Sequence, residues 1–275
     1  MLGKTETILR YRPAASALAT VRCKSRGRCS GQAVPQIPAT AALRRLKEGN
    51  ARFVRGRARF PTARKEIVAN LAQKQQPYAA ILGCSDSRVP PELVFDCGFG
   101  ELFVVRVAGN VLGPSILGTL QYAASHLHTQ LFVVLGHEGC GAVKAALATK
   151  FEGATQKSRI AVLLKNIVPA LRGLDAAQPP DALLRAGVEA NVRHTIQMLS
   201  NTPEARVRAA TTNMKLVGAV YELESGRVRF LDETNFEQAT REPEAFRKDP
   251  GTLVQPVSAK IELKMLPFSV ARVDL

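Results

Sequence analysis

The sequence predicts an α/β protein with a central, largely parallel β-sheet, flanking helices and an N-terminal helical arm. Three short apolar runs carry this prediction: Tyr78–Gly83, Leu102–Val107 and Leu131–Gly136. Continuous apolar runs of this length are typical of strands that are buried on both faces of a sheet. Segments of helical periodicity alternate with these runs, and strand–helix alternation implies parallel crossovers.

The helices are predicted from apolar residues at helical spacing. Two of them precede the first strand, at residues 41–53 and 67–73. The pattern is helical again over 115–128 and in the alanine-rich segment 141–149. A further amphipathic helix is predicted over 186–199.

The last predicted elements form a hairpin at the edge of the sheet. Its strands are Val217–Tyr221 and Val228–Leu231, joined across Glu224-Ser225-Gly226. Residues 233–275 mix proline, charge and a late apolar stretch, and we expect them to be a C-terminal extension of unknown role. The predicted folded domain therefore spans residues 39–232.

Residues 1–38 have the composition of a targeting segment. They carry seven basic residues against the single acid Glu6, and they are rich in alanine, serine and threonine without a long apolar centre. This composition is typical of an organellar transit peptide, and it favours the chloroplast over the mitochondrion. The alternative is a disordered basic leader that carries no targeting signal.

Charge and composition argue against several other classes of protein. The net charge is +15, but no nucleic-acid-binding motif accompanies it, and aromatic residues make up 5% with no tryptophan. We therefore expect no nucleic-acid partner, and no apolar stretch is long enough to predict a membrane span. Five cysteines without a secretory signal indicate an intracellular protein whose thiols bind metal or act in catalysis.

One group of residues predicts a metal site. Cys84 follows the first predicted strand, His137 follows the third, and Cys140 opens the next helix. Ligands of such sheets collect at the carboxyl ends of the strands, so these side chains should meet at one edge. Thiolate and imidazole are ligands that zinc prefers, and three protein ligands leave a fourth position open. The alternatives are thiols and imidazole without metal, or a closed structural zinc site.

Asp86 and Arg88 follow Cys84 at alternate positions, so a carboxylate–guanidinium pair is expected beside the metal. The arginine would keep the carboxylate ionised. Asp86 would then either accept a hydrogen bond from zinc-bound water or bind zinc as a fourth ligand in a closed state. The alternative is an ordinary surface salt bridge.

Three segments of the chain resemble the β-class carbonic anhydrases: Cys84–Glu92, Gly100–Asn110 and Gly136–Ala142. The resemblance extends over about residues 41–231. It implies a zinc enzyme that interconverts carbon dioxide with bicarbonate and a proton, by attack of zinc-bound hydroxide on carbon dioxide. It also implies zinc ligation by Cys84, His137 and Cys140, with Asp86 and Arg88 as the catalytic pair.

The resemblance implies further roles and a partner. Gln75 matches a glutamine that hydrogen-bonds bicarbonate in plant-type members, and the N–H of Gly141 would be a second donor. A homodimer or a multiple of dimers is implied, with clefts at the subunit interface and N-terminal helices that embrace the partner. Some bacterial members form a noncatalytic bicarbonate pocket from a tryptophan and an arginine. Here Ile81 replaces the tryptophan, although Arg106 stands in the arginine's place, so this pocket is not expected.

The remaining candidates are weaker. Cys97 stands where many relatives have glutamine, and we predict a packing role, with a redox-sensitive thiol as the alternative. Surface or capping roles are favoured over proton relay for His126, His128 and His194. The two cysteines of the leader are assigned no metal.

Two alternative functions use the same residues. One is hydrolysis of a related small substrate such as carbon disulfide. The other is a catalytically silent protein that binds zinc or bicarbonate. The presence of both Asp86 and Arg88 favours the carbonic anhydrase over the silent protein.

Overall fold

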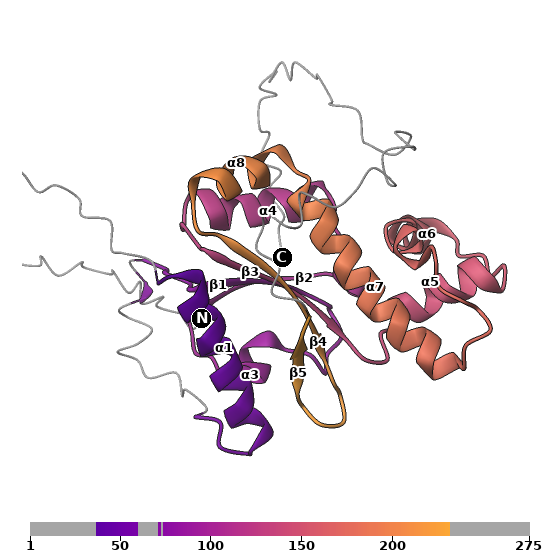
Figure 1. The fold of residues 1–275 in the computed structure, drawn as a ribbon, viewed down its shortest axis with the longest axis horizontal. Coiled ribbons are helices and arrows are strands. Elements are labelled where there is room, and N and C mark those ends of the chain that lie inside the picture. The colour runs from indigo at the N-terminus through magenta and orange to yellow at the C-terminus, as the bar shows by residue number, and fades with distance from the viewer. Residues whose placement is uncertain (1–36, 60–70, 73, 232–275) are drawn as a thin grey trace, which may run out of the picture. The chain divides into compact units, whose positions relative to one another are not determined.

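The computed structural model describes residues 37–59, 71–72 and 74–231. In this part of the chain, five strands form one sheet in the order β2-β1-β3-β4-β5 (Figure 1). All neighbouring strands are parallel except β4 and β5, which are antiparallel. The predicted α/β fold with a largely parallel sheet is thereby confirmed. The strands are β1 (Ala79–Gly83), β2 (Leu102–Arg106), β3 (Leu131–His137), β4 (Lys215–Tyr221) and β5 (Val228–Phe230).

The helices differ from the prediction mainly in number and in one boundary. They are α1 (Ala39–Val54), α3 (Pro91–Val94), α4 (Pro114–Ser125), α5 (Gly141–Phe151), α6 (Ser158–Lys165), α7 (Pro180–Ser200) and α8 (Pro203–Thr211), with 3₁₀ turns η1 (Ala108–Asn110) and η2 (Val168–Leu171). The sequence missed α3, α6 and α8, and it began α7 six residues late. The predicted extension 233–275 lies outside the described residues, as does the predicted helix 67–73 apart from Leu71 and Ala72 and the leader apart from Ile37 and Pro38.

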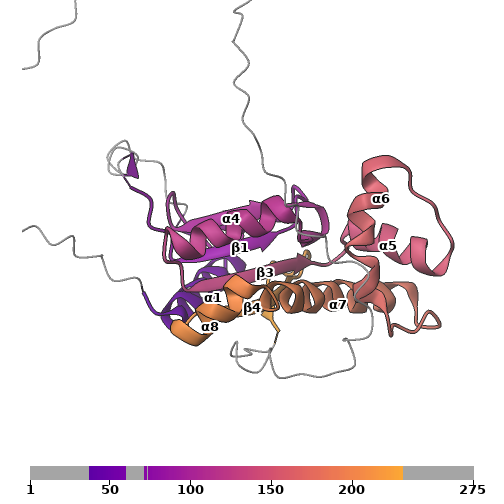
Figure 2. The same cartoon turned by 90° about the horizontal axis from the view of Figure 1, so that it is seen from above.

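Helices cover both faces of the sheet. Figure 1 shows α1 and α3 on one side and α4, α7 and α8 on the other. Seen from above, α4 and α7 run lengthwise with the strands (Figure 2). None of the described helices is long and apolar enough to cross a membrane.

Two hydrophobic cores, one on each face, explain why the strand segments are apolar throughout. Successive side chains of a strand point to opposite faces. In β1, Leu82 packs into the core beneath α4, α5 and α7, whereas Ile81 packs into the core beneath α1 and α3. Val134 and Val133 of β3 divide in the same way. A polar residue at any of these positions would therefore be buried.

Asn50 of α1 connects three elements on the α1 face. Its Nδ2 donates hydrogen bonds to the carbonyl oxygens of Val94 (3.1 Å) and Gly226 (2.9 Å). The N–H of Val228 donates to its Oδ1 at 2.9 Å. This buried side chain thus fixes α1 to the end of α3 and to the β4–β5 hairpin.

The close approach of α1 to the segment after α3 generates a prediction for Gly49. A Cβ added at Gly49 would lie 1.9 Å from the carbonyl oxygen of Phe95, so the backbone must shift. Gly49→Ala should lower the free energy of unfolding by about 1–3 kcal/mol, as measured by denaturant titration. The control is Gly118→Ala in α4, where an added Cβ meets nothing within 4 Å; this variant should be equally stable or more stable. Unchanged stability of Gly49→Ala would contradict the contact.

Candidate metal centre

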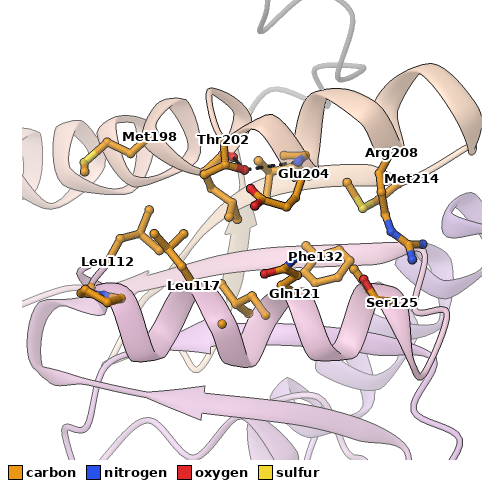
Figure 3. A pocket seen from close by; sticks show the side chains of 18 of the residues that line it. Leu112, Leu117, Gln121, Ser125, Phe132, Met198, Thr202, Glu204, Arg208 and Met214 are labelled. Carbon is orange, nitrogen blue, oxygen red and sulfur yellow. Dashed lines mark hydrogen bonds between the residues drawn. The ribbon is translucent and has the colours of Figure 1, made fainter. Parts of the chain in front are cut away.

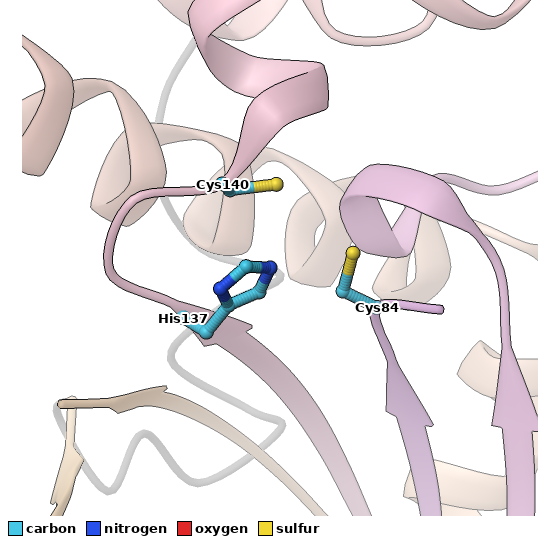
Figure 4. Close-up of side chains that lie close together, drawn as sticks. All are labelled: Cys84, His137 and Cys140. Carbon is cyan, nitrogen blue, oxygen red and sulfur yellow. The ribbon is translucent and has the colours of Figure 1, made fainter. Parts of the chain in front are cut away.

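Cys84, His137 and Cys140 meet at the carboxyl edge of the sheet. Cys84 directly follows β1, His137 is the last residue of β3, and Cys140 is the N-cap residue of α5. Because β1 and β3 pair in parallel, their carboxyl ends lie side by side. The two Sγ atoms and a ring nitrogen of His137 lie within 4.8 Å of one another (Figure 4). All three side chains are buried.

The histidine ring is oriented with one nitrogen toward this group. Nδ1 of His137 lies 2.8 Å from the carbonyl oxygen of Glu138, which can only accept, so Nδ1 carries the proton and donates. Nε2 then presents a lone pair. It is buried, and in the described part of the chain it has no hydrogen-bond partner. Buried polar atoms rarely stay unpaired, and a metal ion would satisfy this one.

The two thiols interact with each other. The neighbouring Cys140 thiol lowers the pKa of Cys84, and the hydrogen bond from the Gly109 N–H adds to this, against the effect of burial. The Gly109 nitrogen lies 3.3 Å from Cys84 Sγ. Tetrahedral zinc with Zn–S bonds near 2.3 Å separates its sulfur ligands by roughly 3.8 Å. The donor set and its spacing therefore fit such an ion after a small closing movement.

Arg88 holds the carboxylate of Asp86 beside this group. Its Nε donates to Oδ1 at 2.9 Å and its Nη2 to Oδ2 at 2.7 Å, while its backbone N–H donates to Oδ1 at 3.0 Å. These bonds hold the pKa of Asp86 well below its usual range. Oδ2 of Asp86 lies 3.9 Å from His137 Nε2. An ionised carboxylate thus stands next to the candidate ligands.

Arg106, at the end of β2, fixes the backbone of the same loop. Its Nε donates to the carbonyl oxygen of Cys84 at 2.9 Å, and its Nη2 donates to that of Asp86 at 2.5 Å. Sequence reasoning considered Arg106 only for a noncatalytic bicarbonate pocket and missed this role. The register that pairs Gly83 with Arg106 accounts for the contact, and that register is not visible in the sequence.

Gly141 and Gln75 lie in different surroundings. Gly141 is the first residue of α5 and is exposed, and its N–H donates no hydrogen bond within the described residues. Gln75 is also exposed, but it precedes β1, whereas Cys84 follows it. A five-residue strand spans about 16 Å. Within one chain, Gln75 therefore lies toward the opposite edge of the sheet from Cys84, His137 and Cys140, which we call the metal group.

Cys97 and the other histidines lie apart from the group. Cys97 Sγ is 3.0 Å from the hydroxyl of Tyr78, and burial raises the pKa of Cys97 to about 11. A buried thiol of this kind fits the predicted packing role. His126 is the C-cap residue of α4 and contacts the ring of Tyr122. His194, in α7, is half-buried, and burial lowers its pKa.

A cavity of about 540 Å³ opens between α4 and the α7–α8 region (Figure 3). Its lining is mainly apolar and includes Leu117, Phe132, Met198 and Met214. No cysteine or histidine and no predicted site residue lines it. The cavity therefore offers no alternative site for the predicted metal chemistry.

Comparison with known proteins places the chain in a family. A family model described as carbonic anhydrase matches residues 79–228. Carbonic anhydrase 2 of Mycobacterium tuberculosis is 38% identical over 202 residues, which are 72% of this chain and 96% of that protein. A carbonic anhydrase of Mycolicibacterium smegmatis is also 38% identical, over 71% of this chain and 94% of its own length.

Solved structures agree with these matches. One from the report of two tetrameric β-carbonic anhydrases of Sordaria macrospora superposes with a TM-score of 0.56 at 25% identity. The superposition covers 61% of this chain and 86% of that chain. Because the family model, the relatives and the fold agree, the chain belongs to the β-carbonic anhydrase family of enzymes.

Proposed function

We propose that this chain catalyses the reversible hydration of carbon dioxide to bicarbonate and a proton at a zinc ion held by Cys84, His137 and Cys140. One observation carries the proposal: the buried, unpaired Nε2 of His137 faces two buried thiols. Two sulfurs and one imidazole suit zinc, and three protein ligands leave one position for water or substrate.

Asp86 and Arg88 are placed to orient the nucleophile. Zinc, when bound, lowers the pKa of the water molecule that it coordinates. In the three-histidine carbonic anhydrases this pKa is about 7. The ionised carboxylate of Asp86 would accept a hydrogen bond from a water at the site and so orient that water toward carbon dioxide. Arg88 keeps the carboxylate charged and in place through its paired hydrogen bonds.

The contacts of Asp86 favour the open state over the closed one. If Asp86 moved onto the metal as a fourth ligand, its three hydrogen bonds from Arg88 would break or rearrange. Charge-assisted bonds of this kind are the stronger ones in proteins. The observed pairing thus supports a resting site whose fourth position is free for water.

Gly141 is suited to bind the product. The first N–H groups of a helix have no partner within the helix, and its N-terminus favours anions. Gly141 begins α5 next to Cys140, and its N–H is unpaired in the described part. Bicarbonate leaving the metal would therefore meet a hydrogen-bond donor at this position.

We also propose that the active form is a dimer or a multiple of dimers in which Gln75 serves the site of the partner. Gln75 and Cys84 lie at opposite ends of β1, so Gln75 cannot serve the site of its own chain. The Sordaria macrospora enzymes are described as tetrameric, which supports an assembly of this kind. Targeting to the chloroplast or the mitochondrion stays a prediction. The relatives from Mycobacterium and Mycolicibacterium are bacterial and do not support it.

Asp86→Asn should retain zinc and lose carbon dioxide hydration by roughly 10²-fold or more, because general acid–base groups contribute about that much. Zinc content by atomic absorption and hydration rate by stopped flow measure the two effects. The control is Asp175→Asn, since Asp175 also accepts a hydrogen bond from an N–H two residues on but lies in another loop. Full activity of Asp86→Asn would exclude Asp86 from the mechanism. Wild-type turnover of carbon disulfide without carbon dioxide hydration would replace the proposed substrate.

Cys140→Ala should bind clearly less than one zinc per chain, because a two-ligand site holds zinc far more weakly. Cys97→Ala is the matched control, since it removes an equally buried thiol that contacts Tyr78 and lies outside the metal group. Metal analysis after dialysis compares the two variants. Equal zinc content in both would contradict ligation by Cys140.

Mixing two inactive variants tests the role of Gln75. Asp86→Asn and Gln75→Ala homodimers should each be impaired. If Gln75 acts across the interface, a mixed dimer contains one site with both groups intact, so unfolding and refolding the variants together should restore activity. If Gln75 acts within its own chain, mixing restores nothing, and a fully active Gln75→Ala homodimer would mean that Gln75 has no role at the site. Size-exclusion chromatography with light scattering confirms that dimers have reformed.

A further inference from the structure

A buried chain of hydrogen bonds connects helix α7 to the metal group. The side-chain Nδ2 of Asn191 donates to the carbonyl oxygen of Gly109 at 2.8 Å. The N–H of Gly109 in turn donates to Sγ of Cys84 at 3.3 Å. Asn191 is fully buried, and Gly109 and Cys84 are buried as well. Asn191, which lies 82 positions after Gly109 in the sequence, is thus connected to a candidate ligand through a single residue.

The segment that carries Gly109 needs such support. Gly109 lies in the short turn η1 with a φ of 68°, a conformation that suits glycine, which is also the most flexible residue. A Cβ at this position would come within 2.7 Å of Ile167, so another residue could not readily stiffen the turn. Thr195, one turn after Asn191 in α7, donates to the carbonyl oxygen of Asn110 at 3.4 Å. Two side chains of α7 therefore hold two consecutive peptide groups of η1.

Packing alone does not explain an asparagine at position 191. Its Nδ2 must face Gly109, because a carbonyl oxygen can only accept. Its Oδ1 is then left buried without a hydrogen-bond partner in the described part of the chain. An unpaired buried amide oxygen destabilises a fold, and an apolar side chain would avoid it. The asparagine at position 191 is therefore explained by the hydrogen bond that its amide donates to Gly109.

We propose that Asn191 is a positioning residue for the metal centre, an inference that rests on the zinc site proposed above. By holding the Gly109 carbonyl, Asn191 limits rotation of the Gly109 backbone, so that the N–H on the preceding peptide group stays directed at Cys84 Sγ. A hydrogen bond to a thiolate fixes the position of the sulfur and withdraws some of its charge. Two thiolates would donate more charge to a bound zinc ion than two imidazoles, so this withdrawal would help to preserve the Lewis acidity that zinc supplies. Partners of this kind affect metal affinity or activity by roughly 10–100-fold in other sites.

The variants are Asn191→Asp, which keeps the shape but removes the donor, and Asn191→Ala, which removes the side chain. Asn50→Asp is the matched control. Asn50 is also a buried asparagine that donates to backbone carbonyls, but those belong to Val94 and Gly226 on the other face of the sheet. It should lower stability without changing the metal site.

Two readouts separate positioning from general destabilisation. Zinc affinity, measured by competition with a chelator on the full chain, should fall roughly 10–100-fold in both Asn191 variants and stay at the wild-type value in Asn50→Asp. In cobalt-substituted protein, the sulfur-to-cobalt charge-transfer band should move to longer wavelength in the Asn191 variants only, because the sulfur becomes richer in charge.

Wild-type affinity and spectrum in the Asn191 variants would overturn the inference, as would an equal loss in Asn50→Asp. If the wild type itself binds no zinc, the proposed metal site fails instead. Should neither Asn191 variant fold, the unmutated chain supplies the test by NMR. The Gly109 amide signal should then shift strongly when zinc is added to metal-free protein, and an unshifted signal would refute the inference.

Discussion

The parallel pairing of β1 with β3 is the constraint on which the candidate site depends. Leu82 pairs with Val134 and Gly83 pairs with Leu135, so the residues that follow, Cys84 and Gly136, lie at the same height of the sheet. A slip of one residue would turn every side chain of β1 to the other face. Because β1 and β3 are buried throughout, such a slip would disrupt the close packing of both cores. The two cores thereby fix the separation of the candidate metal ligands Cys84 and His137.

The helices on the two faces contribute in different ways. On one face, α1 is connected through Asn50 to α3 and to the β4–β5 hairpin, and these contacts stabilise the sheet. On the other face, α5 supplies Cys140 at its N-terminus, and α7 reaches the metal group through Asn191. Arg106 completes the support from the end of β2. The candidate ligands are therefore held by backbone and side-chain contacts from α5, α7 and β2.

Sequence reasoning succeeded where a pattern is local. The buried strands and the metal group were predictable, because apolar runs end directly at Cys84 and His137. Helix α8 was missed because its nine residues contain only three alanines and a valine as apolar side chains, and its clearest signal is the cap at Thr202, which accepts from Ala205 N–H. The early start of α7 was missed because Pro179 and Pro180 resemble a loop, although proline is favoured in the first turn of a helix.

Contacts between distant residues could not be predicted in this way. Asn191 looks like an ordinary polar position of an amphipathic helix, and its partner Gly109 lies 82 residues earlier. The buried ion pairs of Asp96 with Arg52 and Arg59 could not be predicted from the sequence either, since both arginines come from the region of α1. Such roles follow from tertiary packing, which one sequence without its relatives does not reveal.

X-ray absorption at the zinc edge shows whether two thiolates and one imidazole bind a single ion that keeps an exchangeable position. We expect two sulfur neighbours at about 2.3 Å and two nitrogen or oxygen neighbours at about 2.0–2.1 Å, with one zinc per chain. A shell of four sulfurs, a shell without sulfur, or purified protein that takes up no zinc would contradict it.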